Sequence, residues 1–167
     1  LWALDFFAVK TAKGVWLQVL LVIDIHTREL LDLRVYDGWD VDSAWTSRMF
    51  NAILGRTKRQ PIAIVHDHGP QFLGQFQRQM RVLEVGEELT PARIPQMNCY
   101  AERAIGSIRR ELLRHIRVPD ARELQFFLDE YRRYANTERA HQGLDGRTPE
   151  EVSSAAPEAE VIDLAAV

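Results

Sequence analysis

Three acidic residues occupy positions that suit a metal-dependent catalytic site. Asp5 interrupts an apolar stretch that runs from Leu1 to Val9, and a carboxylate buried in such a stretch is costly unless it is paired or bound to a metal ion. Asp67 follows the short apolar run 61–65, and Glu102 lies in a segment with helical periodicity. Enzymes that transfer phosphoryl groups with two metal ions need a few converging carboxylates, which hold the ions about 4 Å apart. The three acids together therefore predict metal-dependent phosphoryl transfer.

Taken singly, each acid also has an ordinary structural interpretation. Asp5 would face solvent if its strand lay at the edge of a sheet. Asp67 would form a turn with Gly69, since Asp and Gly are typical turn residues. Glu102 would favour the macrodipole at the start of a helix. Catalysis is the better interpretation of the set, because magnesium keeps several waters and takes only a few protein carboxylates, so three acids suffice.

The triplet His66-Asp67-His68 raises a zinc site as an alternative. Adjacent residues on a strand point to opposite faces, and the single cysteine, Cys99, gives no support for a closed zinc site. One cysteine also excludes an internal disulfide framework. We therefore expect no zinc module, and a reducing cytoplasm suits the cysteine content.

The segment from Asn98 to Ile116 predicts the helix that carries Glu102. At about 3.6 residues per turn, Glu102 falls between an apolar stripe and an arginine-rich stripe, where a metal-binding carboxylate would lie at a boundary between protein and DNA. Gly106, one turn further on, would let a backbone approach closely. The apolar stripe comprises Ala101, Ile105, Ile108, Leu112 and Ile116.

The net charge of −3 argues by itself against a nucleic-acid-binding protein, because contact with phosphates requires a basic surface. The local distribution is different: between positions 103 and 117, one acid, Glu111, accompanies five arginines. A solvated helix face is the ordinary interpretation of such a run, and DNA binding is the functional one. The candidate DNA-binding residues are Arg103, Arg109, Arg110, Arg114 and Arg117.

The elements that must position these residues follow from periodicity and turn residues. The expected strands are 1–9, 15–23, 30–36, 61–65 and 89–94, and the expected helices are 42–54, 71–85, 98–116 and 123–134. In the third strand, we expect Leu31, Leu33 and Val35 on one face. This order predicts an α/β fold with a five-stranded mixed sheet, in which three antiparallel strands are followed by parallel strands and helices flank the sheet.

The length of 167 residues suits one domain. We expect a catalytic core over residues 1–152 and a flexible tail over 153–167, where the composition turns to Ala, Ser, Pro and Glu. No apolar run approaches the roughly 18 residues that cross a bilayer, so we expect no membrane segment. Leu1 opens directly on a strand-like run, which suggests an excised domain or a truncated chain.

Six stretches carry a family resemblance: Leu4-Asp5-Phe6-Phe7, Val22-Ile23-Asp24-Ile25-His26-Thr27-Arg28, His66-Asp67-His68-Gly69-Pro70-Gln71-Phe72, Asn98-Cys99-Tyr100-Ala101-Glu102-Arg103, Tyr134-Ala135-Asn136-Thr137-Glu138-Arg139-Ala140-His141-Gln142-Gly143-Leu144 and Thr148-Pro149-Glu150. In their order and spacing, these stretches make the sequence similar to the integrase core domain of bacterial insertion-sequence transposases, which are relatives of retroviral integrases. The resemblance covers residues 1–152.

The resemblance implies a ribonuclease H-like fold and an enzyme that cleaves DNA and transfers the cut strands, with two Mg²⁺ or Mn²⁺ ions bound by Asp5, Asp67 and Glu102. It implies that the partners are DNA, namely the element ends and the target, and that the chain forms at least a homodimer. It also implies that an N-terminal DNA-binding domain or a partner chain is missing upstream, and that the protein acts at the nucleoid in a bacterial cytoplasm. Asn98 matches a family position near the active site, and we expect its side chain to cap the helix and help to place Glu102. The candidate dimer contacts are Trp2, Trp16, Trp39 and Trp45.

The sequence departs from the family pattern in three places. The interval between Asp67 and Glu102 is 34 residues, slightly shorter than usual; Ala140 replaces a proline; and histidines flank Asp67. Two alternatives keep the same fold: a domesticated relative that binds DNA or a partner without chemistry, and a ribonuclease H or junction-resolving nuclease that only hydrolyses. The intact acids favour the transposase over the first alternative, and the motif with Arg139 and His141 favours it over the second.

Overall fold

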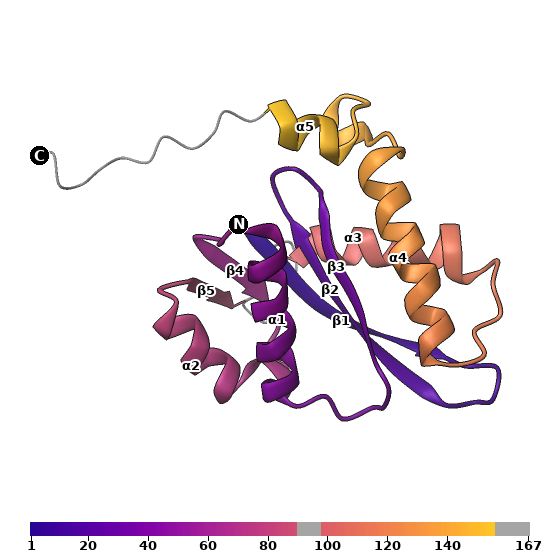
Figure 1. The fold of residues 1–167 in the computed structure, drawn as a ribbon, viewed down its shortest axis with the longest axis horizontal. Coiled ribbons are helices and arrows are strands. Elements are labelled where there is room, and N and C mark those ends of the chain that lie inside the picture. The colour runs from indigo at the N-terminus through magenta and orange to yellow at the C-terminus, as the bar shows by residue number, and fades with distance from the viewer. Residues whose placement is uncertain (90–97, 156–167) are drawn as a thin grey trace, which may run out of the picture.

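The chain folds around a five-stranded mixed sheet with helices on both faces (Figure 1). The computed structural model describes residues 1–89 and 98–155. The strands are β1 (Trp2–Lys10), β2 (Trp16–Asp24), β3 (Leu30–Tyr36), β4 (Ala63–His66) and β5 (Gly86–Leu89), in the order β3-β2-β1-β4-β5. The pairs β1–β2 and β2–β3 are antiparallel, whereas β1–β4 and β4–β5 are parallel. The predicted mixed sheet is therefore confirmed.

The first three strands form the predicted antiparallel meander. β1 pairs with β2 along its whole length, from Trp2 opposite Asp24 to Lys10 opposite Trp16. The tight link between the two strands contains Gly14 with a φ of 84°, a left-handed conformation that glycine adopts without a steric penalty.

A β-bulge in the pairing of β2 with β3 changes which side of the sheet the residues of β3 face. The register shifts between Val22, which lies opposite Asp32, and Ile23, which lies opposite Leu30. As a result, Leu31 packs in one apolar layer and Leu33 in the layer on the opposite face of the sheet. The prediction that Leu31 and Leu33 share a face is wrong, because the extra residue breaks the strict alternation of the strand.

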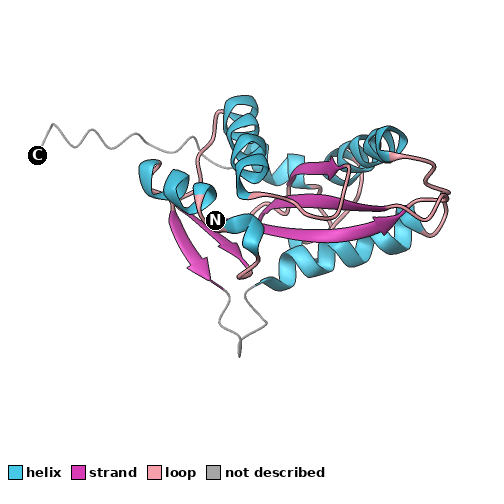
Figure 2. Ribbon diagram, turned by 90° about the horizontal axis from the view of Figure 1, so that it is seen from below, coloured by secondary structure: helices cyan, strands magenta, loops and turns pink. Residues whose placement is uncertain are grey.

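The helices cover the two faces of the sheet in separate layers (Figure 2). One layer consists of α1 (Ser43–Thr57) and α2 (Gln75–Val82), whose Phe50 and Phe76 are fully buried against the sheet. The other layer consists of α3 (Cys99–Ile108) and α4 (Ala121–Thr137), which bury Ile108 and Leu128. Among the described helices, none is long and apolar enough to cross a membrane.

Two predicted helices are each divided in the structure. Segment 71–85 becomes a 3₁₀ turn (Pro70–Phe72) and α2, which are separated at Gly74 with a φ of 59°. Segment 98–116 becomes α3 and a π-helical turn (Arg109–Leu113), and such a turn shifts the phase of the residues that follow it. The predicted strand 89–94 overlaps β5 at Leu89 alone, because β5 begins earlier, at Gly86; positions 90–94 lie outside the described residues.

Side chains cap the starts of two helices. The side chain of Asp42 accepts a hydrogen bond of 2.6 Å from the backbone N–H of Trp45 and so caps α1. At α5 (Pro149–Ala155), Thr148 and Glu151 exchange hydrogen bonds between side chain and backbone, at 2.8 and 3.2 Å. This exchange is a capping box.

Two amide side chains of α4 pair with the outer edge of β3. Gln125 accepts the N–H of Val35 and donates to the carbonyl of Leu33, both at 2.8 Å. Asn136 does the same at Leu30, accepting the N–H at 2.9 Å and donating to the carbonyl at 3.0 Å. β3 is the last strand on its side of the sheet, so these side chains satisfy backbone groups that would otherwise lack partners.

Replacing Asn136 with Ala is therefore expected to destabilise the chain by about 1–3 kcal/mol, because both backbone groups of Leu30 lose their partner. Urea unfolding followed by tryptophan fluorescence measures the change. Asn51→Ala is the matched control, since its single side-chain hydrogen bond, from Gln79, is exposed, and it should change the free energy of unfolding by less than about 0.5 kcal/mol. Equal stabilities of the Asn136 variant and the wild type would refute this account of the β3 edge.

Candidate active site

The first two candidate acids lie on neighbouring strands. β1 and β4 are parallel, with Trp2 opposite Ile64 and Ala3 opposite Val65. The same register, continued by two residues, brings Asp5 level with Asp67, which directly follows the end of β4. Sites gather at the carboxyl ends of parallel strands in open α/β sheets, so the position of Asp67 suits a functional residue.

The third candidate acid lies on the helix layer that Asp5 faces. Alternate β1 residues on either side of Asp5, Ala3 and Phe7, pack in the apolar layer formed with α3 and α4, so Asp5 points to the same side of the sheet. Glu102 lies in the first turn of α3, and its side chain is exposed. Asp5 and Glu102 therefore belong to the same side of the sheet.

The charges of the three acids interact. The pKa of Asp5 is raised from its ordinary value of 3.8 to about 6, chiefly by burial and also by the negative charges of Asp67 and Glu102, whereas the N–H of Phe6 and the positive charge of Arg109 act in the opposite direction. The hydrogen bond from Phe6 to Oδ1 of Asp5 measures 2.7 Å. A half-buried carboxylate whose pKa is raised by two neighbouring acids is typical of a cation-binding site.

Asp67 has structural contacts of its own. Its Oδ1 accepts the N–H of Gly69 at 3.0 Å, so the turn expected from the ordinary interpretation is present. Nδ1 of His66 lies 2.6 Å from the carbonyl oxygen of Asp67, and the buried His66 ring lies 4.5 Å from the ring of Phe72. These contacts hold the backbone at Asp67 and leave its other carboxylate oxygen, Oδ2, without a hydrogen bond to the described part of the chain.

The donor chemistry of the three acids fits a hard divalent cation such as Mg²⁺, which prefers carboxylate oxygens. Within residues 1–89 and 98–155, no three His, Cys, Asp or Glu side chains are arranged closely enough to hold a metal ion. The electrostatic coupling at Asp5 and the chemistry of the donors support the assignment, and the metal site stays a prediction.

Two supporting residues differ from the expectation. Asn98 occupies the N-cap position of α3 but makes no capping hydrogen bond with its side chain, so its predicted capping role is wrong. Its backbone, at φ −100° and ψ 11°, lacks the extended conformation of an N-cap residue that reaches the helix N–H groups. At Gly106, an added Cβ would meet only a side-chain nitrogen of Arg110, at 3.1 Å, so no other backbone of the described chain approaches there.

The five candidate DNA-binding arginines are all exposed, and their positions differ. Arg109 lies near enough to Asp5 to lower its pKa, which agrees with its expected place beside Glu102. Arg110 donates to the hydroxyl of Ser107 at 3.1 Å. Arg103 stands over the ring of Tyr100, with Cζ 5.9 Å from the ring centroid. The exposed residues are Arg103, Arg109, Arg110, Arg114 and Arg117.

The tryptophans expected at a dimer interface divide into two groups. Trp2 is 2% exposed and packs on Phe50 with ring centroids 5.8 Å apart, so it is a core residue and its assignment as a surface contact is wrong. Trp45 is half-buried against Phe6 and Tyr36. Trp16 and Trp39 are 46% and 58% exposed.

A network of side chains joins the π-helical turn to the segment after α4, and no local sequence pattern indicates it. The carboxylate of Glu111 accepts two hydrogen bonds from Arg139, at 2.8 and 2.9 Å, and one from the hydroxyl of Tyr131, at 2.9 Å. Burial tends to raise the pKa of Glu111, but the hydrogen bonds from Arg139 and Tyr131 outweigh it and lower the pKa. The network explains what Arg139 of the resemblance motif does in the fold.

Known proteins resemble the chain in sequence. A family model described as the integrase core domain matches residues 84–149. The transposase for insertion sequence element IS904 of Lactococcus lactis subsp. lactis (strain IL1403) is 26% identical over 157 residues, which cover 90% of this chain and 59% of that protein. The insertion element IS407 uncharacterized 31.7 kDa protein of Burkholderia multivorans is 25% identical over 154 residues, which cover 92% of this chain and 54% of that protein. The chain thus spans little more than half the length of these relatives.

Solved structures resemble the chain in fold. The HTLV-2 integrase catalytic core domain in complex with magnesium superposes with a TM-score of 0.67 at 19% identity, over 90% of this chain and 93% of that one. The catalytic domain of the Mos1 mariner transposase gives a TM-score of 0.64 at 16% identity, over 78% of this chain and 68% of that one. These likenesses confirm the predicted ribonuclease H-like fold.

Proposed function

We propose that this chain, whose sequence and fold are those of an integrase-type catalytic core, cleaves DNA strands and transfers the cut ends to a target. The observation that carries the proposal is the interaction of three acids on adjacent elements, in which Asp67 and Glu102 both raise the pKa of Asp5. The homology to insertion-sequence transposases supports transposition as the setting, and the proposed core spans residues 1–152.

In this proposal, Asp5, Asp67 and Glu102 bind two divalent ions, Mg²⁺ or Mn²⁺. Bound there, such ions would activate the attacking oxygen and stabilise the charge on the leaving oxygen. They would also offset the repulsion between the three like-charged acids. Arg109, which acts on the charge of Asp5, would contact a phosphate of the bound strand.

The proposed partners are the two ends of a mobile element, the target DNA and a second copy of the chain. A dimeric form of the HTLV-2 integrase catalytic core domain supports the homodimer. The greater length of the curated relatives supports an additional DNA-binding domain or partner chain, and their bacterial sources support action on DNA of the bacterial nucleoid.

The test is a strand-transfer assay with the full-length protein and DNA that represents the ends of its own element. Cut and joined products should form with Mg²⁺ or Mn²⁺ and disappear with EDTA, and re-addition of the metal should restore them. DNA binding without cleavage under every divalent metal would replace this proposal with a domesticated DNA-binding relative. Cleavage without joining would replace it with a hydrolytic nuclease.

Removal of Arg110 or Arg114 by substitution with Ala should weaken DNA binding regardless of sequence, because each is proposed to contact phosphate. The slope of log affinity against log salt concentration should fall by up to about one unit per lost contact. Fluorescence anisotropy with two unrelated duplexes over a range of salt concentrations measures both effects. Arg81→Ala, an exposed change on α2 in the opposite helix layer, is the control and should leave the slope unchanged; an equal effect of all three substitutions would contradict the proposed DNA-binding face.

A further inference from the structure

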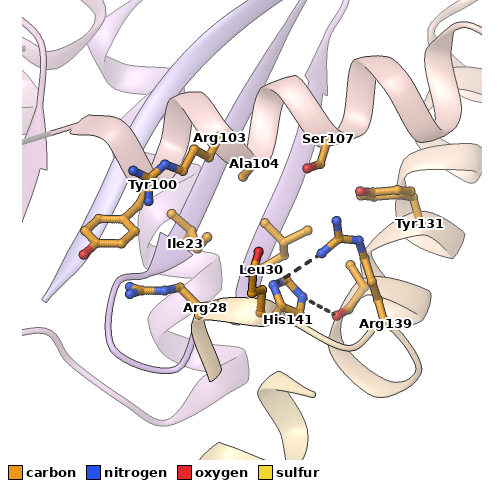
Figure 3. Close-up of a pocket in the computed structure, with 13 residues that line it drawn as sticks. Ile23, Arg28, Leu30, Tyr100, Arg103, Ala104, Ser107, Tyr131, Arg139 and His141 are labelled. Atoms are coloured by element: carbon orange, nitrogen blue, oxygen red, sulfur yellow. Dashed lines mark hydrogen bonds between the residues drawn. The ribbon is translucent and has the colours of Figure 1, made fainter. Parts of the chain in front are cut away.

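A pocket of about 230 Å³ lies on α3, in the same helix layer as the candidate active site. Its walls come from the turn between β2 and β3, from α3, from the end of α4 and from the segment that follows α4 (Figure 3). These segments include residues of three stretches of the family resemblance: the one ending at Arg28, the one ending at Arg103, and the one containing Arg139 and His141. The mechanism proposed above uses Glu102 of the second stretch and no residue of the other two.

The pocket carries positive charge. Arg28, Arg103 and Arg139 line it together with His141, and none of the described residues that line it is acidic. The nearby carboxylate of Glu111 is occupied by Arg139 and Tyr131. Arg28 and Arg103 therefore face the pocket without a carboxylate partner among the described residues.

The side chain of Arg28 has a donor that a ligand could satisfy. Arg28 lies in the turn between β2 and β3, where its backbone N–H donates to the carbonyl of Asp24 at 2.9 Å and its φ is 62°. Its Cζ lies 3.9 Å from the centroid of the Tyr100 ring, and its Nη1 is buried with no hydrogen-bond partner in the described chain. A buried donor of a charged group without an acceptor costs free energy, so an acceptor bound in the pocket would stabilise this arrangement.

The far end of the pocket is fixed by Arg139 and His141. Nη1 of Arg139 lies 3.4 Å from Nδ1 of His141, and Nε2 of His141 lies 3.3 Å from the carbonyl oxygen of Ala135. Arg139 can only donate, so Nδ1 accepts and Nε2 carries the proton. Arg28 and Arg103 are the charged donors of the pocket that are not engaged with a carboxylate of the described chain, and Figure 3 shows both guanidinium groups beside the ring of Tyr100.

We propose that this pocket binds a phosphate group through the guanidinium of Arg28, with Arg103 adding positive charge from the other guanidinium that lies against the ring of Tyr100. The planar fork of arginine matches the geometry of phosphate oxygens and binds them with two hydrogen bonds. The cavity is smaller than the roughly 300–1,000 Å³ pockets of drug-sized ligands, so it suits a phosphate with part of a sugar. The phosphate comes from a DNA backbone or from a small phosphate ester, and none of the three candidate acids lines the pocket.

The experiment titrates the ¹⁵N-labelled chain, in EDTA and at low salt, with inorganic phosphate, with thymidine 5′-monophosphate and with a short DNA duplex. EDTA removes metal-dependent chemistry, so failure of the catalytic proposal does not affect the result. The amide signals of Arg28, Tyr100 and His141 should shift and saturate. Shifts with the duplex at lower concentration than with either small ligand identify a DNA phosphate, and the reverse order identifies a small phosphate ester.

Three variants test the assignment to Arg28. Arg28→Gln should weaken the response at the pocket signals by at least about tenfold, and Arg28→Lys, which keeps the charge but loses the fork, should give an intermediate value. Arg48→Gln removes the same charge from the exposed surface of α1, across the sheet, and should leave the pocket response unchanged. Dispersed spectra of all variants show that they are folded.

Two results would overturn the proposal. One is the absence of shifts at the pocket signals with all three probes in the folded wild type. The other is a response of Arg28→Gln equal to that of the wild type. A duplex that shifts only the signals of Arg109, Arg110 and Arg114 also counts against the pocket when both small ligands leave it unchanged.

Discussion

Replacing Asp67 with Asn is expected to reduce strand cleavage and joining by a factor of about 10³ or more. The substitution keeps the shape of the side chain, and the amide oxygen can still accept the 3.0 Å hydrogen bond from Gly69. It removes a negative charge from the set of acids that acts on Asp5. Metal affinity and stabilisation of charge in the transition state should therefore fall together, while the local fold stays intact.

DNA binding by Asp67→Asn should remain within about twofold of the wild type, because affinity rests on phosphate contacts elsewhere. A small gain is expected, since one negative charge leaves the proposed DNA-facing surface. The strand-transfer assay with Mg²⁺ measures the first effect, and anisotropy in EDTA measures the second. Asp145→Asn is the matched control, because Asp145 is exposed and Asn tolerates its φ of 56°. Full strand-transfer activity of the Asp67 variant would show that the catalytic assignment is wrong.

The sequence predicted the sheet well, because its signals there are local. The apolar runs around Asp5 and Leu20 and the turn at Gly14 predicted the meander. The short apolar strand before Asp67 predicted a buried β4, which pairs with β1. The strand order was not predicted from the sequence; in the structure it places β1 beside β4 and brings Asp5 to the level of Asp67.

The failures have specific physical causes. The bulge that separates Leu31 from Leu33 depends on pairing with β2 and has no signature in the alternating pattern of β3. The π-helical turn at Arg109 interrupts a segment whose periodicity reads as one continuous helix. The capping role of Asn98 was inferred from its residue type, whereas its backbone angles decide whether the side chain can reach the helix N–H groups.

The sequence indicated the three acids of the candidate site, but it did not indicate the contacts of the residues around them. Each acid stands out by its position in the sequence. Asp5 interrupts an apolar segment, Asp67 directly follows a short apolar strand, and Glu102 lies between the apolar and the arginine-rich stripe of its helix. The contact between Arg28 and Tyr100 joins residues far apart in the chain, and nothing in either local pattern predicts it. No sequence pattern predicted the hydrogen bonds between Glu111 and Arg139 either, although the resemblance included the motif that contains Arg139.

Replacing Asp5 with Asn is expected to stabilise the metal-free chain at pH 7.5 by about 1–3 kcal/mol. Burial, with the charges of Asp67 and Glu102, raises the pKa of Asp5 from 3.8 to about 6. The folded chain therefore binds a proton at Asp5 more tightly than the unfolded chain does. The stabilising effect of that proton is complete below the unfolded pKa and is lost as the pH rises through the folded pKa. Asn is neutral throughout and avoids this loss.

The difference between the variant and the wild type should thus be small near pH 4 and should grow until the pH exceeds about 6, following the pKa of Asp5. Urea unfolding at a series of pH values, in EDTA, measures it through tryptophan fluorescence. Asp37→Asn, an exposed change, is the control and should show no such growth. Saturating Mg²⁺ should narrow the difference at pH 7.5, because a cation that binds the native acids stabilises the wild type by mass action. A wild type that is as stable as Asp5→Asn at pH 7.5 in EDTA would mean that Asp5 is not under electrostatic strain, and the cation-binding interpretation of the three acids would lose its main support.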